Sequence, residues 1–311
     1  MAINAGSILN KGLELTIDAI PLKTKQWEIM VGGNISFNRN QFLSIGADAS
    51  SGEVFMSADA TSPVMKTFVW GNALATGSSD TNPLNIFIEG QPMGLFYGYV
   101  TDGIVQEGEV GANTNGMTSG PGSIKYVDKN KNGVRDAGDR AVIGNPQPKF
   151  TYGFNASVSW KKLTLKVYFT GAYDFDIFNM NHMQDYDTKT TKNMYRSAYF
   201  NAWTPENKNN KWPAFGKSDN NVFSDRFVED ASYLRISNLA LSYSLPINKK
   251  KSKILKGMNI SASVSNLAIF TDYTGMSPLS NSMGTNIKKM GVDINTAPLP
   301  RSYNFDVKFT F

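Results

Sequence analysis

Apolar and polar residues alternate along several stretches of the chain, most clearly over its last eleven residues, 301–311. Because successive side chains of a β-strand point to opposite faces, a period of two predicts a strand with one apolar and one polar face. A tilted strand of about 9 to 11 residues is long enough to cross a bilayer. We therefore expect a transmembrane strand here, with its aromatic face against lipid. Its apolar positions are Tyr303, Phe305, Val307, Phe309 and Phe311.

The same alternation predicts eight further strands. They fall at residues 13–19, 27–37, 84–89, 95–105, 150–160, 163–169, 232–245 and 258–268. The connections between strands alternate between short and long, and the long ones cover residues 39–83, 106–147, 174–230 and 270–300. Short periplasmic turns alternating with long extracellular loops are typical of bacterial outer-membrane barrels. The expected fold class is therefore all-β, an antiparallel up-and-down transmembrane β-barrel to which this chain contributes about nine strands.

A soluble protein offers the competing explanation. A β-sandwich also alternates apolar and polar positions, and it buries the apolar faces of its two sheets against each other. The alternative hypothesis is thus a soluble β-sandwich ligand-binding module with a calcium-stabilised loop. The two hypotheses differ in whether the apolar side chains of the strands are sealed inside the molecule. The deciding positions are Phe154, Val158, Phe305 and Phe309.

The predicted barrel is incomplete. Single-chain bacterial barrels have even strand numbers and closed edges, whereas nine strands leave an odd number and an open edge. The segment after Met1 also lacks the basic region, apolar stretch and cleavage site of an export signal. We therefore expect residues 1–311 to form one incomplete barrel domain of a longer protein that carries the signal upstream.

Composition excludes several classes of site. The chain has no cysteine, which removes disulfides, zinc–thiolate sites and thiol catalysis. Its single histidine, His182, leaves one candidate base for a serine nucleophile and no accompanying motif, so we expect no enzyme. The net charge is +5, and the lysines clustered at 249–256 lie between two predicted strands. We expect them to form a solvated periplasmic turn rather than a nucleic-acid site.

Residues 128–139 carry the pattern of an EF-hand calcium loop. Oxygen ligands stand at positions 1, 3 and 5, glycine at position 6, a backbone carbonyl at position 7 and a carboxylate at position 12. We predict a structural calcium ion that stiffens a long outer loop, because Ca²⁺ prefers such oxygens. An Asx-rich turn without metal is the alternative. The candidate ligands are Asp128, Asn130, Asn132, Val134, Asp136 and Asp139.

Aromatic residues are scattered through the long segment 174–230. Aromatic rings stack on sugar rings or peptide side chains, but they also pack loops against their neighbours, and the sequence leaves both roles open. The candidates for substrate contact are Tyr195, Tyr199, Trp203 and Trp212. A second group near strand ends suits the interfacial girdles of a membrane barrel. It consists of Trp27, Tyr152, Trp160 and Tyr243.

Several motifs, among them YVDKNKNGVRDAGDRAVIGNPQPKF and APLPRSYNFDVKFTF, together match a known family. The matching stretches lie at 4–17, 90–106, 121–155, 233–246, 263–278 and 297–311. On these motifs the chain resembles the carboxyl-terminal part of the SusC/RagA-type TonB-dependent outer-membrane transporters of Bacteroidetes. One departure follows a Tyr-Thr-Gly turn, where Ser277-Pro278-Leu279 replaces the Asp-Pro-Glu that is common in the family.

The resemblance implies the last strands of a barrel of about 22 strands, whose lumen is closed by a plug. It implies import of large nutrients, oligosaccharides or peptides, across the cell outer membrane. Energy would come from TonB–ExbB–ExbD acting through the plug region, which this chain does not contain. The implied partners also include a SusD-like surface lipoprotein over the outer face and the lipid of the outer membrane, and no nucleic acid.

Overall fold

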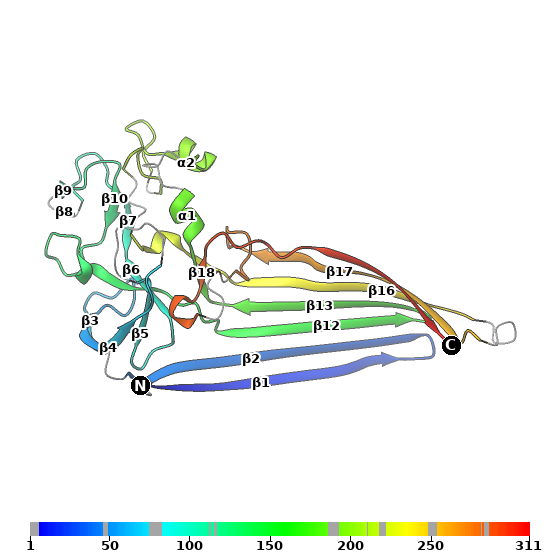
Figure 1. Ribbon diagram of the computed structural model, residues 1–311. Helices are drawn as coiled ribbons and strands as arrows, with labels where there is room; N and C mark the ends of the chain where they lie inside the picture. Colours follow the sequence, from blue (N-terminus) through cyan, green and yellow to red (C-terminus); the bar gives the residue numbers. More distant parts are fainter. Residues whose placement is uncertain are drawn as a thin grey trace.

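The computed structural model places most of the chain in β-strands (Figure 1). It describes residues 6–45, 49–74, 83–111, 113–114, 117–185, 193–209, 211–217, 222–247, 254–280, 282 and 286–311. Most of the predicted basic turn lies outside these residues, namely Lys249, Lys250, Lys251 and Lys253.

Seven long strands form one antiparallel sheet in which each strand pairs with the next of the seven along the chain. In order they are β1 (Gly6–Lys23), β2 (Trp27–Ile45), β12 (Phe150–Trp160), β13 (Leu163–Tyr173), β16 (Tyr233–Leu245), β17 (Gly257–Thr271) and β19 (Ser302–Thr310). Figure 1 shows a long sheet with the loop segments at the end where β1 begins, and the carboxyl end of the chain at the opposite end. The predicted antiparallel up-and-down order holds for these strands.

The register of the sheet keeps apolar and polar side chains on opposite faces. One row of paired residues that crosses all seven strands is apolar throughout: Leu22, Ile29, Val158, Leu165, Leu241, Ala262 and Phe305. The adjacent row, on the other face, is polar throughout: Lys23, Glu28, Ser159, Thr164, Ser242, Ser261 and Asp306. Because a slip of one residue would exchange the two faces, this pattern specifies the register.

The apolar face is not covered by the rest of the described chain. Phe305 is 72% exposed, Phe309 49% and Phe154 46%, and Val158 is only partly buried. A soluble sandwich would bury these side chains against a second sheet. The structure therefore disfavours the sandwich alternative and leaves an apolar surface that requires an apolar surrounding.

The structure corrects the predicted strand count. Segments 84–89 and 95–105 are predicted above as membrane strands, but they do not join the long sheet. Instead, β5 (Asn85–Ile88) and β6 (Leu95–Tyr99) have four and five residues, each of them buried. Strands this short cannot cross a bilayer, and their apolar character reflects burial on both faces rather than contact with lipid. Among the described residues, seven strands rather than nine form the long sheet, and residues 46–149 are one long insertion.

Short elements fill the insertions between the long strands. A five-stranded sheet has the order β11-β6-β5-β4-β3 and includes β3 (Ser50–Val54), β4 (Val64–Trp70) and β11 (Arg140–Gly144). The other short strands are β7 (Thr101–Ile104), β8 (Asn113–Thr114), β9 (Met117–Thr118), β10 (Ile124–Tyr126), β14 (Asp176–Asn179), β15 (Val228–Asp230) and β18 (Val292–Asp293). The helices are η1 (Ala137–Asp139), α1 (Met180–Asp185), α2 (Arg196–Asn201), η2 (Asp225–Phe227) and η3 (Ile287–Lys289). No helix in the described part of the chain is long and apolar enough to span a membrane.

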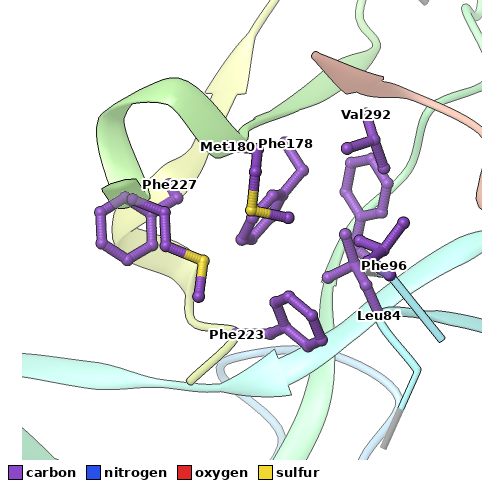
Figure 2. Close-up of a cluster of buried hydrophobic side chains, with 9 residues drawn as sticks. Leu84, Phe96, Phe178, Met180, Phe223, Phe227 and Val292 are labelled. Atoms are coloured by element: carbon purple, nitrogen blue, oxygen red, sulfur yellow. The ribbon is translucent and has the colours of Figure 1, made fainter. Parts of the chain in front are cut away.

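The described parts of three insertions, residues 46–149, 174–232 and 272–301, gather at one end of the sheet into an outer body (Figure 1). They share a hydrophobic core (Figure 2). The ring of Phe178 meets those of Phe96, Phe223 and Phe227 at centroid distances of 6.2, 5.6 and 6.1 Å. Because every insertion contributes to this core, each depends on the other two for its packing. The core residues drawn and labelled are Leu84, Phe96, Phe178, Met180, Phe223, Phe227 and Val292.

Candidate functional site

A surface pocket lies where the second and third insertions meet. Its volume is about 370 Å³, within the range of about 300 to 1,000 Å³ usual for small-molecule sites. The end of β14, α1 and the segment before α2 form one wall, and the turn after β17 and residues 295–298 form the other. Its amide, hydroxyl, imidazole and aromatic lining groups include Asn179, Asn181, His182, Tyr195, Thr274 and Asn295.

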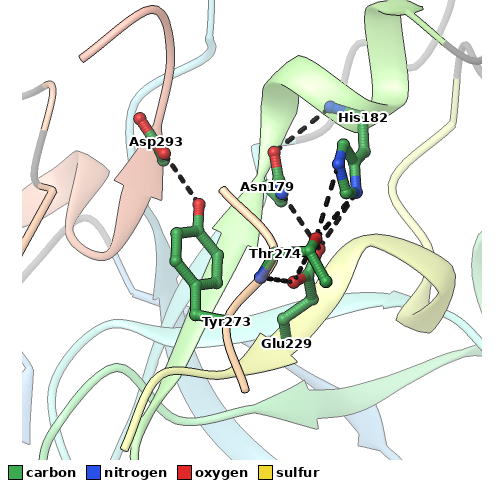
Figure 3. Close-up of polar contacts among 6 residues, drawn as sticks. All are labelled: Asn179, His182, Glu229, Tyr273, Thr274 and Asp293. Carbon is green, nitrogen blue, oxygen red and sulfur yellow. Dashed lines mark hydrogen bonds and ion pairs between the residues drawn. The ribbon is translucent and has the colours of Figure 1, made fainter. Parts of the chain in front are cut away.

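The carboxylate of Glu229, in β15, binds three of these lining residues (Figure 3). Its Oε1 accepts a hydrogen bond from Asn179 Nδ2 at 2.9 Å and lies 3.1 Å from His182 Nδ1. Its Oε2 accepts one from the Thr274 amide at 2.8 Å and one from the Thr274 hydroxyl at 2.7 Å. One carboxylate thus links β14, α1 and the turn after β17.

Hydrogen bonding fixes the ionisation state of Glu229. Burial alone would raise the pKa of this carboxyl, but the donors from His182, Thr274 and Asn179 outweigh it and lower the pKa from 4.5 to about 2. At about 1.4 kcal/mol per pKa unit, the folded state stabilises the carboxylate relative to the neutral acid by about 3 kcal/mol more than the unfolded chain does. Glu229 is therefore ionised at physiological pH.

A second polar contact anchors the same turn. The phenol of Tyr273 is buried and donates a hydrogen bond to Asp293 Oδ2 at 2.7 Å. Burial, together with this carboxylate, raises the pKa of Tyr273 far above its usual value, so the phenol stays protonated. A Cβ at Gly275 would lie 2.4 Å from the Tyr273 hydroxyl oxygen. The three residues of the Tyr-Thr-Gly turn therefore have different roles. Tyr273 anchors the turn, Thr274 binds Glu229, and Gly275 permits close packing.

The predicted calcium ligands converge in part. Asn130 Nδ2 donates to Asp136 Oδ1 at 3.2 Å, and Asn132 Nδ2 donates to Asp136 Oδ2 at 2.7 Å. The Gly133 amide donates to Asp128 Oδ2 at 2.6 Å. Gly133 has φ 79°, which makes the sharp turn that the sixth position of such a loop requires.

Asp139, the twelfth position, has a structural role in this loop. Its buried carboxylate accepts hydrogen bonds from the amides of Lys129 at 2.8 Å and Asp136 at 2.9 Å. Burial raises the pKa of Asp139 above its usual range, although these amides oppose the shift. Val134 is exposed, and its amide donates to Asn132 Oδ1 at 2.8 Å. Within the described ranges, no group of three or more His, Cys, Asp or Glu side chains is arranged to hold a metal ion.

The tyrosines among the aromatic candidates are both accessible. Tyr195 lines the pocket, is 45% exposed, and meets the His182 ring edge-on at 6.0 Å. Tyr199 lies on α2 outside the pocket lining, is 59% exposed, and its ring centroid is 5.6 Å from that of Phe215. The structure therefore places one of the two tyrosines at the pocket.

The tryptophans lie deeper in the outer body. Trp203 is 6% exposed, belongs to a buried hydrophobic cluster, and donates from Nε1 to Gln106 Oε1 at 2.9 Å. Its ring thus packs the second insertion against the first, which is the alternative role considered for these aromatics. Trp212 is partly buried, with the ammonium of Lys211 5.7 Å from its ring centroid.

The chain is similar to TonB-dependent receptors along almost its whole length. TonB-dependent receptor P3 of Formosa agariphila is 27% identical over 99% of the chain, and TonB-dependent receptor SusC of Bacteroides thetaiotaomicron is 27% identical over 98% of it. The structure of the RagAB peptide transporter matches 99% of the chain with a TM-score of 0.70 at 22% identity. The chain is a segment of a SusC/RagA-type TonB-dependent receptor. No protein-family model matches it.

This SusC/RagA-type segment spans 29% of receptor P3, 26% of SusC and 30% of the matched RagAB chain. The structural likeness shows that it shares the mostly β-strand fold of that RagAB chain over this length. TonB-dependent receptors are transporters of the outer membrane and not enzymes. The predictions that the protein lies in the outer membrane and is not an enzyme are therefore confirmed through the family.

The network around Glu229 is not apparent from the sequence. His182 is considered above only as a possible catalytic base, whereas the structure gives it a carboxylate partner from β15. Glu229 and Thr274 are 45 positions apart in the chain, and no local pattern signals such a contact. The Tyr-Thr-Gly turn was the available signal, because three consecutive residues with such different requirements indicate a turn with a defined environment.

Proposed function

We propose that the protein containing this segment imports large nutrients, oligosaccharides or peptides, across the outer membrane with energy supplied through TonB. The observation that carries this proposal is the seven-stranded sheet whose apolar face is uncovered and whose opposite face is polar. Such a sheet suits a barrel wall with lipid outside and an aqueous lumen inside. The TonB-dependent receptor SusC and the RagAB peptide transporter, both similar to this chain, support it.

In this proposal the sheet is part of a closed barrel of about 22 strands. Further strands would pair with the outer edges of β1 and β19, since an uncovered strand edge is prone to aggregation. The aromatic residues near strand ends fit two interfacial girdles. Trp27 and Trp160 are paired across strands with ring centroids 6.0 Å apart, and Tyr243 lies at the same end of the sheet. Tyr152 lies near the start of β12, toward the other end of the sheet.

The outer body is the proposed contact surface for a SusD-like lipoprotein, as the two-component name RagAB of the matched transporter suggests. Coupling to TonB–ExbB–ExbD would act through a plug region elsewhere in the protein. Among the aromatic candidates, Tyr195, Tyr199 and Trp212 remain proposed substrate contacts, whereas Trp203 belongs to the core.

We propose further that the loop 128–139 binds a structural calcium ion. Support comes from the converging side chains of Asp128, Asn130, Asn132 and Asp136 and from the sharp turn between them. Rotation of the two asparagine amides would direct oxygen rather than nitrogen toward Asp136 and supply the hard ligands that calcium requires. The Val134 carbonyl and Asp139 complete the proposed set. The ion would stiffen the loop without taking part in transport.

Import is tested in the source bacterium with the gene deleted or restored. Uptake of fluorescently labelled oligosaccharide and peptide mixtures is expected to fall in the deletion strain for one of the two mixtures. It should also fall in the restored strain when an uncoupler dissipates the proton gradient that drives TonB. Equal uptake of both mixtures with and without the gene would refute the proposed function.

A further inference from the structure

Two cationic side chains lie next to each other on the apolar face of the long sheet. Lys11 of β1 pairs with Arg39 of β2, and the neighbouring pair on the same face is Leu13 with Phe37. Lys11 and Arg39 are both exposed. Because side chains two residues apart in a strand share a face, these cations continue the apolar face and not the polar one.

The polar face carries no charge at this level of β1 and β2. The pairs on either side of Lys11 and Arg39 lie on that face and are uncharged: Asn10 with Asn40, and Gly12 with Asn38. In a barrel with an aqueous lumen, the polar face would keep an unpaired charge hydrated, whereas the outer face turns it toward lipid. The placement of both cations on the outer face therefore points to a partner outside the barrel wall.

The two cations lie just beyond the apolar band of the sheet. From Trp27 to Phe37, β2 has the length of about 9 to 11 residues that a tilted strand needs to cross a bilayer. Aromatic rings mark the end of this band, since Phe150 lies 5.5 Å from Phe37 and stacks on Tyr173 at 5.1 Å between ring centroids. Such rings sit at the level of lipid headgroups. Arg39 follows Phe37 toward the end where β2 enters the first insertion (Figure 1).

The described chain supplies no counter-charge for this pair. Arg39 Nη1 donates to the backbone carbonyl of Lys149 at 2.6 Å, which holds the guanidinium beside the start of β12. A third cation, the Lys149 ammonium, is paired with Asp174. Within the residues that the structure describes, neither Lys11 nor Arg39 forms an ion pair. Because like charges directly opposite each other destabilise a sheet, an anion bound between them would offset a cost that the described residues leave standing.

A lipid phosphate fits both the charge and the position of this pair. A guanidinium can donate to two oxygens of one phosphate, and an ammonium adds a compact positive charge. A lipid places its phosphate just outside its acyl chains, which is where Lys11 and Arg39 follow the apolar pair Leu13 and Phe37. A small soluble anion lacks acyl chains that would hold it at this level. The arrangement therefore favours a headgroup over a free anion.

We propose that Lys11 and Arg39 bind the phosphate group of an outer-leaflet lipid whose acyl chains lie against Leu13 and Phe37. The site goes beyond the proposed import function, but it rests on the barrel proposed there, with the outer body facing the cell exterior. A lipid bound here would hold the outer rim of the barrel at a fixed depth in the membrane.

The test uses the full-length protein, immobilised in a non-ionic detergent and titrated with fluorescent lipid A that carries one phosphate. The same lipid without its phosphate is titrated in parallel, and inorganic phosphate is added as a competitor. The site variants are Lys11→Gln/Arg39→Gln and Lys11→Gln alone. Lys166→Gln/Lys308→Gln is the matched control, because it removes two exposed cations from the polar face of the same sheet.

We expect the Kd for the phosphorylated lipid to rise roughly 30-fold in the double site variant and about fivefold in Lys11→Gln, and to stay unchanged in the control. The lipid without phosphate should bind weakly to every form, and millimolar inorganic phosphate should displace little of the phosphorylated lipid. If the double variant fails to fold, Lys11→Gln alone decides, because its exposed side chain lies at the surface of β1.

Equal Kd values in the site and control variants would overturn the inference. So would equal binding of the two lipids by the wild type, no binding of either lipid, or displacement by inorganic phosphate. Because lipid binding is measured on purified protein without transport, each of these results would leave the import proposal standing. Loss of import in the gene-deletion experiment is likewise independent of the lipid site.

Discussion

Replacing Glu229 with glutamine tests whether this carboxylate holds the outer body together. Glutamine keeps the size of the side chain and resembles the neutral acid. The lowering of the Glu229 pKa from 4.5 to about 2 therefore measures the stabilisation of the ionised carboxylate, which the substitution removes. At about 1.4 kcal/mol per pKa unit, Glu229→Gln should weaken local stability at pH 7 by about 3 kcal/mol. The local opening equilibrium of the outer body around Glu229 should shift roughly 100-fold toward the opened form.

Hydrogen exchange read by mass spectrometry, on the full-length protein in detergent, measures this shift. The peptides covering α1 and the turn after β17 should lose protection in Glu229→Gln, while the long sheet stays protected. Glu206→Gln, at an exposed glutamate, is the control. Because the pKa of Glu229 is lowered by folding, its contribution is present above about pH 4.5 and is lost as the pH falls toward about 2.

Wild-type protection, corrected for the intrinsic pH dependence of exchange, should therefore decline across that window, and the variant should show no such decline. Equal protection of wild type and Glu229→Gln at pH 7 would refute the reasoning, because the network would then contribute nothing to the position of the two walls.

Three further outcomes are expected. Phe178→Ala should destabilise the outer body by about 3 to 5 kcal/mol, seen as lower protection in all three insertions together; loss confined to one insertion would contradict a shared core. Phe305→Lys should cost up to about 2 to 4 kcal/mol of folding free energy in urea titrations in lipid vesicles, whereas Asp306→Lys on the polar face should cost little; similar values for both would argue against a lipid-facing row. Calcium titration by calorimetry should show binding with Kd of roughly 10⁻⁴ to 10⁻³ M, and Asp128→Ala should abolish it. Absence of any heat of binding in the wild type would refute the calcium site.

The long strands were predictable because each carries its own pattern. The terminal strand exposes its apolar face along its full length, so alternation in the sequence maps directly onto the two faces of β19. The same logic failed for β5 and β6, where burial on both sides produces apolar runs that resemble membrane strands until their length is known. Residue spacing alone therefore placed too many strands in the long sheet.

The pocket was less accessible to sequence reasoning. Tyr195 could be named because an aromatic residue in a polar loop is conspicuous. Asn181 and Asn295 could not, since they meet across 114 positions through a backbone amide, and asparagine is common in loops of every kind. The buried position of Trp203 was likewise undetermined, because its partner Gln106 lies in another insertion.

The single hydrophobic nucleus shared by the insertions has a practical consequence for engineering new transport preferences. Grafting one loop from a relative would place a foreign surface against two native ones. The poorly packed contact would be expected to destabilise the whole outer body. Transplanting all three loops as one unit would instead keep the shared core intact.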